Sequence, residues 1–433
     1  MMKKIIVLMA TAAAALLFVW EAAAQEYSLG DLYQQALKNS EKIKYAEENL
    51  FIAKTGKDKA WSLLMPRVTA YGTYNRFSED KYNPTGILIQ PYESGNWGVR
   101  IDESFSLSAR ELKALKIAGQ IITKSEFDLD AARTDFVLAV AASYYDVMKT
   151  RKALEIAAAN MERLTQYRNS VEKKFKVGEL TKTALLRAEG ELSGARSVYL
   201  KATNALKIAR AALVRATGIE ENFRLKETPL PGEDKALLES LRADALAGRA
   251  DLKSYDVNKN MAEEQVGFAR GAFWPNVGLF AIYNRADQDP SGATLNGESV
   301  LAGVSLTFPF FEGGLRMAEL REAKARQRQA QLAYDDFRKS VDIELQAAYL
   351  DVQTQRGTLK FLEDQLAFAQ DNYNAVMRQF DNGLATSLDV MDANSLLLSA
   401  DNNVAEALYN YQLAHLKLKK SSGTLLHFVN MSK

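Results

Sequence analysis

One stretch of this chain occurs twice, and this repetition limits the possible folds more than any other feature. The segment FKVGELTKTALLRA at 175–188 matches FDNGLATSLDVMDA at 380–393, with a Phe, a Gly and a Thr at the same spacing. At the same offset, LAVAASYYDVMKTRKAL at 138–154 matches IELQAAYLDVQTQRGTL at 343–359. A duplicated chain is expected to fold as two copies of one supersecondary unit.

The repeats set the expected domain boundaries. Residues 1–24 predict a secretory signal peptide, because a basic start precedes an apolar run that ends in three alanines. The first repeat then covers 25–218 and the second covers 237–423. The polar, proline-containing connector at 219–236 lies between them, and a C-terminal tail follows at 424–433.

Composition excludes several classes of site. The chain has no cysteine, so disulfides and thiolate metal ligands are excluded. Its 55 basic and 54 acidic residues give a formal net charge of +1, and nothing in this balance indicates a nucleic-acid partner. After the signal peptide there is no run of 18 apolar residues, so no transmembrane helix is predicted.

Each repeat shows the same order of predicted elements. A helical stretch (31–64 or 237–273) ends at a proline, and a β-hairpin follows at 68–107 or 277–310. The strand pattern is clearest where apolar residues alternate with small polar ones, at Val300, Ala302, Val304, Leu306, Phe308 and Phe310. Glu103 interrupts the corresponding apolar face in the first repeat. The strands are about ten residues long, which is enough for a tilted strand to cross a bilayer.

A long proline-free helical pattern follows each hairpin. Apolar residues recur every seven positions, which is typical of a coiled-coil seam, at Leu345, Val352, Leu359, Leu366, Tyr373 and Phe380. About seventy residues of helix would be roughly 100 Å long. Each helix should then turn at a tip, 175–183 or 380–388, where a glycine permits left-handed backbone and a threonine caps the returning helix.

With these features, the chain resembles the TolC family of outer-membrane efflux proteins over nearly its whole mature length. The duplicated unit, the F-x-V-G and F-x-N-G tips, and LTFPFFEGGLRMAEL at 306–320 carry the resemblance. It implies a mixed α/β membrane protein in which each chain gives four transmembrane β-strands to a trimeric 12-stranded barrel. A long α-helical coiled-coil barrel with a small equatorial region would continue through the periplasm.

The resemblance also implies roles for residues at the tips. Asp389 and Asp392 would form two rings of carboxylates at the pore constriction, where they would favour cations and show raised pKa values. The aromatic constraint of the family corresponds to Phe380, and Thr183 is a possible polar partner. The structural alternative for both carboxylates is a solvated helix start, where acids suit the helix dipole.

Further tip residues are expected to contact a periplasmic adaptor; they are Val177, Gly178, Leu180, Gly383, Leu384 and Thr386. The expected partners are two further copies of the chain, this adaptor, an inner-membrane transporter and outer-membrane lipid. The expected function is an outer-membrane channel-tunnel of a tripartite efflux or type I secretion system, with no cofactor and no metal. The sequence leaves the cargo open: drugs, solvents, metal ions and proteins all remain possible.

Two other functions are weighed against the channel. An envelope enzyme is disfavoured, because the only histidines, His415 and His427, have no nearby pattern of catalytic partners. A structural coiled-coil spacer would explain the heptads, although it would explain neither the strand hairpins nor the carboxylates at the second tip.

Overall fold

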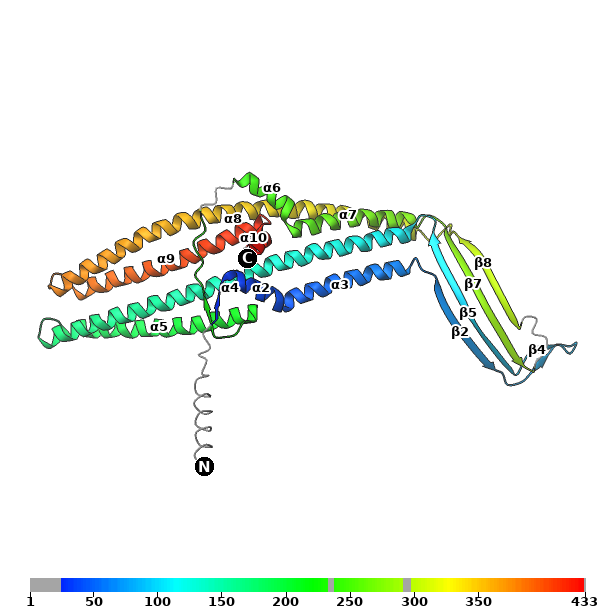
Figure 1. Cartoon of the computed structure of the whole chain (residues 1–433), viewed down its shortest axis with the longest axis horizontal. Helices are drawn as coiled ribbons and strands as arrows, with labels where there is room; N and C mark the ends of the chain where they lie inside the picture. The colour runs from blue at the N-terminus through cyan, green and yellow to red at the C-terminus, as the bar shows by residue number, and fades with distance from the viewer. Residues whose placement is uncertain (1–24, 233–236, 291–296, 432–433) are drawn as a thin grey trace, which may run out of the picture. The chain divides into compact units, whose positions relative to one another are not determined.

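The computed structural model describes residues 25–232, 237–290 and 297–431, so the predicted signal peptide at 1–24 lies outside the described residues. The chain forms two compact units (Figure 1). The sheet unit comprises Tyr45–Asp130 and Ala250–Lys339, and the helical unit comprises the described residues of Met1–Lys44, Ala131–Arg249 and Ser340–Lys433. Each sequence repeat therefore contributes to both units.

A four-stranded antiparallel sheet forms the centre of the sheet unit, in the order β2-β5-β7-β8 (Figure 1). Its strands are β2 (Arg67–Arg76), β5 (Glu93–Ser106), β7 (Asn276–Asp289) and β8 (Glu298–Thr307). The β2–β5 and β7–β8 pairs are the two predicted hairpins. Pairing of β5 with β7 joins the two repeats into one sheet, and the short strands β3 (Lys81–Tyr82) and β4 (Leu88–Gln90) pair within the first hairpin loop.

The register places the alternating apolar residues of all four strands on one face. Val68 pairs with Ile101, Ile101 with Ala281, and Ala281 with Ala302. Glu103 lies on the same face, opposite Leu279, as its position in the sequence pattern predicts. This face is open in the single chain, since Val300 and Val304 are 78% and 73% exposed.

The second hairpin is shorter than predicted. Strand β8 ends at Thr307, so Phe308 and Phe310 do not continue the alternating face. Pro309 has no backbone N–H to donate to a neighbouring strand, which explains the end of pairing here. The chain then turns through Gly313 and Gly314, both with positive φ, into the next helix.

The predicted helical stretches 31–64 and 237–273 are each two helices. In the first repeat, α2 (Leu29–Asn39) and α3 (Glu41–Ser62) are separated by Ser40; in the second, α6 (Leu238–Gly248) and α7 (Ala250–Gly271) are separated by Arg249. Ser40 and Arg249 both have extended backbone angles. Ser40 accepts a hydrogen bond from the backbone N–H of Ile43 on its hydroxyl oxygen, and this cap explains why a new helix begins there.

Two long helices extend through both units, α4 (Arg110–Lys176) and α8 (Leu315–Asp381). Within the sheet unit, α7 packs against the N-terminal third of each: Tyr255 stacks on Phe337 of α8 at 4.3 Å between ring centroids, and Ser254 donates to Asp128 of α4 at 2.5 Å. Among the described residues, no helix is both long and apolar enough to cross a membrane.

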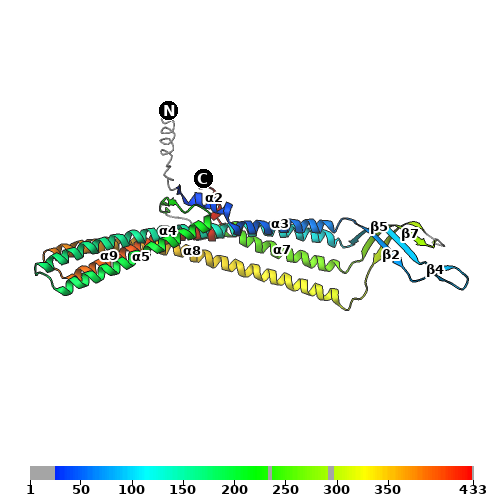
Figure 2. The same cartoon turned by 90° about the horizontal axis from the view of Figure 1, so that it is seen from below.

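In the helical unit, each long helix lies beside its return helix (Figures 1 and 2). Helix α5 (Lys182–Thr217) returns beside α4, and α9 (Ser387–Ser421) returns beside α8. The predicted seam is buried, with Leu345 at 1%, Val352 at 8% and Leu359 at 6% exposure. The short parallel strands β1 (Gln25–Tyr27) and β6 (Phe223–Leu225) and the helix α10 (Leu425–Met431) complete the unit, and the sequence pattern predicted none of the three.

Candidate functional site at the helical tips

Both tips have the same backbone. Helix α4 ends at Lys176 and α5 begins at Lys182, whereas α8 ends at Asp381 and α9 begins at Ser387. Gly178 and Gly383 have φ angles of +86° and +75°, in the left-handed region. In the second tip, the N–H of Gly383 donates to the carbonyl of Phe380 at 3.1 Å, and that of Leu384 donates to Gln379 at 2.8 Å. The first tip repeats these two bonds, so both helices end in a Schellman motif, which requires the glycine.

Threonine caps both returning helices, as the sequence predicts. The hydroxyl oxygen of Thr181 accepts a hydrogen bond from the N–H of Ala184, and that of Thr386 accepts one from the N–H of Asp389. Only the second cap is reciprocal, because Asp389 Oδ2 also accepts hydrogen bonds from the backbone N–H and the hydroxyl of Thr386, both at 2.7 Å. Ala184 occupies the corresponding position in the first tip, so Asp389 completes a capping box that the first repeat lacks.

This cap lowers the pKa of Asp389 in the single chain. The backbone and hydroxyl hydrogen bonds from Thr386 stabilise the carboxylate and hold its pKa below the usual value. The rise expected from neighbouring carboxylates belongs to a threefold assembly, and the hydrogen bonds from Thr386 would act against it. Asp389 and Asp392 are both exposed and lie three residues apart on α9, so they project from neighbouring positions on one face of the helix.

Phe380, which corresponds to the family's aromatic constraint, is buried, as its position in the predicted seam requires. Its side chain is only 2% exposed and is packed into the core below the tips. The Tyr167 ring lies 5.3 Å from that of Phe380, between centroids, and both contact the cluster that includes Val390 and Met391. Thr183 is exposed at the start of α5, where it was expected to be available as a polar partner.

Hydrogen bonds between the two helical hairpins surround this core. The Tyr167 hydroxyl donates to Ser387 Oγ at 2.7 Å, and burial raises the pKa of Tyr167, which keeps the donor protonated. Lys174 Nζ donates to the carbonyls of Phe380 at 2.9 Å and Asp381 at 3.1 Å, which are at the end of α8. We call Tyr167–Ser387 and Lys174–Phe380/Asp381 the inter-hairpin bonds.

A second polar contact joins α4 and α9 farther from the tips. Asn394 Nδ2 donates to Asn160 Oδ1 at 3.0 Å, and both side chains are buried. Arg163 Nε approaches Asn394 Oδ1 at 3.4 Å and lies over the ring of Tyr373. Neither this contact nor the inter-hairpin bonds could be predicted, because periodicity does not show which polar residues face each other on different helices.

The residues expected to contact an adaptor differ in their availability. Val177 and Leu384 are 71% and 80% exposed, so each is the most exposed large apolar side chain of its tip. Leu180 is half-buried against the core below the tips, and the hydroxyl of Thr386 is engaged in the capping box. Within residues 25–232, 237–290 and 297–431, no cluster of three or more His, Asp or Glu side chains could hold a metal ion.

The fold and the tips define a class of protein. Two strand hairpins in one sheet, and two long helical hairpins that end in matching tips, form the architecture of solved outer-membrane channel proteins. One such structure is that of CusC, which was solved in a study of its folding and transmembrane channel formation. It superposes on this chain with a TM-score of 0.82 at 20% sequence identity. That superposition covers 93% of this chain and 94% of CusC.

The sequence comparison identifies the family. The chain matches the outer membrane efflux protein family in two segments, 32–219 and 241–424, and it belongs to that family. The outer membrane protein TolC of Vibrio cholerae is 24% identical over 98% of this chain and 96% of the relative. The alkaline protease secretion protein AprF of Pseudomonas aeruginosa is 22% identical over 67% of this chain and 61% of that protein. The chain is an outer-membrane efflux or secretion channel that extends into the periplasm.

Proposed function

We propose that three copies of this chain form one channel, the outer-membrane component of a tripartite efflux or type I secretion system. The sheet supports the joint assembly. Strands β2 and β8 are its two edges, and both have unpaired ladder groups in the single chain. Edge pairing of β8 in one copy with β2 in the next would close a twelve-stranded barrel and place the open apolar face against lipid.

The tips support the assignment of the periplasmic end of the channel. Threefold symmetry would turn the exposed carboxylates of Asp389 and Asp392 into two rings at the constriction, where they would attract cations and repel anions. The exposed side chains of Val177 and Leu384 are suitable for contact with an adaptor, which would link the channel to an inner-membrane transporter. The cargo remains open among drugs, solvents, metal ions and proteins.

The observation that carries the gate assignment is the asymmetry of the two tips. Their backbones are the same, yet Asp389 and Asp392 of the second repeat stand where the first repeat has Ala184 and Arg187, and only the second tip has a capping box. Fixed charge close to a narrow opening affects ion selectivity more strongly than mobile surface charge. We therefore assign selectivity to Asp389 and Asp392, with Thr183 as a polar neighbour on the first tip.

Single-channel conductance of the purified protein in a planar bilayer tests this proposal. We expect a small conductance with cation preference, and loss of this preference in Asp389→Ala/Asp392→Ala. The matched control is Glu220→Ala/Glu221→Ala, which removes two exposed carboxylates from the connector and should leave the preference unchanged.

Two other outcomes would change the proposal. If the wild type conducts and the tip variant keeps its cation preference, the channel stands and the gate assignment is wrong. If a folded oligomer does not conduct, the structural coiled-coil spacer becomes the better function.

A further inference from the structure

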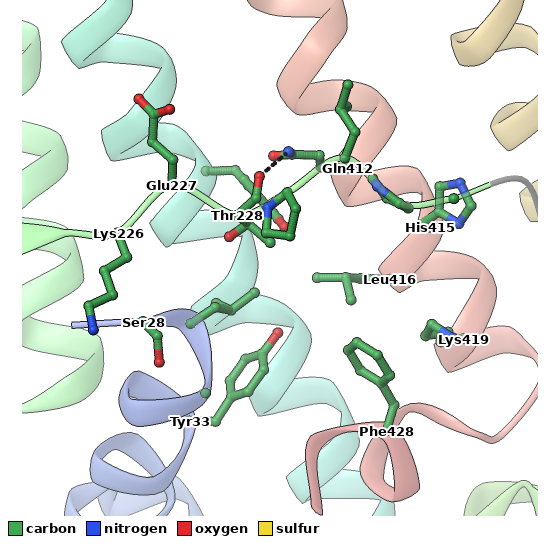
Figure 3. Close-up of a pocket in the computed structure, with 17 residues that line it drawn as sticks. Ser28, Tyr33, Lys226, Glu227, Thr228, Gln412, His415, Leu416, Lys419 and Phe428 are labelled. Atoms are coloured by element: carbon green, nitrogen blue, oxygen red, sulfur yellow. Dashed lines mark hydrogen bonds between the residues drawn. The ribbon is translucent and has the colours of Figure 1, made fainter. Parts of the chain in front are cut away.

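A pocket of about 710 Å³ lies in the helical unit, away from the tips (Figure 3). Helix α2, the segment 226–232 after β6, helix α9 and helix α10 form its walls. The hydrogen bond from Gln412 Nε2 to the carbonyl of Thr228, at 3.0 Å, fixes the segment after β6 to α9. The volume is within the range of sites that bind drug-sized molecules.

The tyrosine at the base of this pocket has a hydroxyl group with no partner. Tyr33 is 2% exposed, and among the described residues no atom forms a hydrogen bond with its hydroxyl. In Figure 3 this hydroxyl points toward Leu416, into the pocket. Burial raises the pKa of Tyr33, so the hydroxyl remains a donor. Since buried polar groups normally have partners, an unsatisfied donor that points into a cavity indicates a ligand with an acceptor atom.

Apolar side chains provide the middle of the pocket. Leu416 of α9 and Phe428 of α10 both lie across from Tyr33 (Figure 3), and Tyr145 of α4 also lines the pocket. These side chains would contact the aromatic or aliphatic part of a ligand, and burial of that apolar surface would contribute favourably to the free energy of binding.

Two lysines make the rim positive. Lys226 and Lys419 line the pocket from opposite walls. The acidic residue beside them, Glu227, is bonded to Arg151 at 3.0 Å, which offsets its charge. The next acidic residue, Asp31, accepts hydrogen bonds from the backbone N–H and hydroxyl of Ser28. Lys419 Nζ lies 4.6 Å from the Phe428 ring centroid, and Lys226 is close enough to help lower the pKa of Asp31, but neither lysine has a carboxylate bonded to it among the salt bridges of the described residues. A ligand with a carboxylate or phosphate group would therefore meet two ammonium groups at the rim.

We propose that this pocket binds an amphipathic anion of drug size: an apolar body with an acceptor atom that reaches Tyr33 and a carboxylate or phosphate group between Lys226 and Lys419. Such a ligand would contact α2, the segment after β6, α9 and α10 at once, and would therefore hold these four elements together. The site is separate from the tips, and the inference does not depend on the proposed gate.

Ligand-observed ¹⁹F NMR of the purified full-length protein in a nonionic detergent tests this site, with 6-fluoro-2-naphthoate as the probe. We expect saturable binding to the wild type. The variant Lys226→Ala/Lys419→Ala should bind at least about tenfold more weakly, since a hydrogen bond to a charged group contributes about 1.5–3 kcal/mol. The control Lys201→Ala/Lys207→Ala, which removes two exposed lysines of α5, should bind as the wild type does. Competition by 2-naphthyl phosphate then shows which anionic group is preferred.

Tyr33→Phe separates ligand binding from a structural role of the hydroxyl. The variant removes an unsatisfied buried group, so the unliganded protein should be at least as heat-stable as the wild type, while probe binding weakens about two- to tenfold. Leu416→Trp should fill the pocket and abolish binding. Three results would overturn the proposal: no saturable binding to the wild type, equal binding by all variants, or lower heat stability of Tyr33→Phe with unchanged binding.

Discussion

Tyr167 of α4 and Ser387 of α9 join the two helical hairpins, with the phenol oxygen 2.7 Å from the serine oxygen. The bond lies beside the Phe380 ring, inside a core to which α4, α5, α8 and α9 all contribute. Any movement that separates the hairpins must break this bond and expose the core. The inter-hairpin bonds are therefore the contacts that we expect to keep the tips closed.

Removal of the Tyr167–Ser387 bond should favour opening. Tyr167→Phe and Ser387→Ala each remove one partner, which corresponds to about 0.5–1.5 kcal/mol for a single hydrogen bond. In planar bilayers, each variant should spend about two- to tenfold more time in a conducting state than the wild type. The double variant should resemble the single variants, because both act through one bond. Additive effects would show that the two residues act separately.

Lys174 should stabilise the end of α8. It donates to the last carbonyls of the helix and lies 4.8 Å from the Phe380 ring centroid, so Lys174→Met removes charge-assisted hydrogen bonds of about 1.5–3 kcal/mol together with a cation–π contact. We expect faster hydrogen exchange at residues 376–384. The adjacent exposed Lys173 supplies the control, since Lys173→Met keeps both bonds. Equal exchange in the two variants would contradict this role.

The Asn160–Asn394 pair should respond differently to single and double substitution. Asn394→Ala leaves the buried amide of Asn160 without this partner, at a cost of about 1–3 kcal/mol, and should lower the apparent melting temperature. Replacement of both residues by leucine removes both amides but also the acceptor of Arg163 Nε, so it should recover only part of the loss. A double variant that is less stable than Asn394→Ala would show that the amides do more than satisfy each other.

Acid should loosen the second tip through Asp389. The Thr386 hydrogen bonds hold its folded pKa below the usual value of 3.8, so the cap contributes its full stability above the unfolded pKa. This contribution is lost as the pH falls through the lower, folded value. Hydrogen-exchange protection of the first turn of α9, corrected for intrinsic rates, should therefore be constant from pH 7 to about pH 5 and fall below about pH 4.

Two variants provide the controls for the acid effect. Asp389→Asn should lack the acid transition, because it has no carboxylate to protonate. Asp392→Asn should retain it, because the capping box does not include Asp392. If Asp392→Asn lost the transition, the titrating carboxylate would be that of Asp392, and the prediction for Asp389 would be wrong.

Much of this fold could be predicted from local patterns. In each tip the glycine permits the positive φ that ends one helix, and the threonine side chain can cap the next. The Schellman motifs and caps could therefore be predicted from the sequence. The alternating residues of the strands likewise predicted one apolar face, which the register confirms. In each case the necessary information lies within about ten neighbouring residues.

The features that the sequence did not predict are contacts between distant segments. Phe175 and Phe380 occupy matching positions in the repeats, yet Phe175 is 37% exposed and Phe380 is 2% exposed. The difference arises because the Tyr167 ring of the first hairpin covers Phe380, and helical periodicity does not identify the neighbouring helix. The hydrogen bonds from Thr386 that lower the pKa of Asp389 in the single chain were likewise not predicted, because the sequence pattern shows the cap but not which group accepts from it.

Gly423 and Gly178 provide a matched test of how closely the helical unit is packed. Both have positive φ angles, +75° and +86°, so a substitution by alanine at either position should cost about 1–2 kcal/mol in backbone conformation. A Cβ at Gly178 would meet no atom within 4 Å. At Gly423 it would lie 2.7 Å from the backbone nitrogen of Arg249 and 2.8 Å from the carbonyl carbon of Gly248. Backbone atoms cannot move aside as a flexible side chain can, so Gly423→Ala should lower the apparent melting temperature clearly more than Gly178→Ala. If both variants lowered the melting temperature equally, the end of α9 could move away from the break between α6 and α7 at little cost in stability.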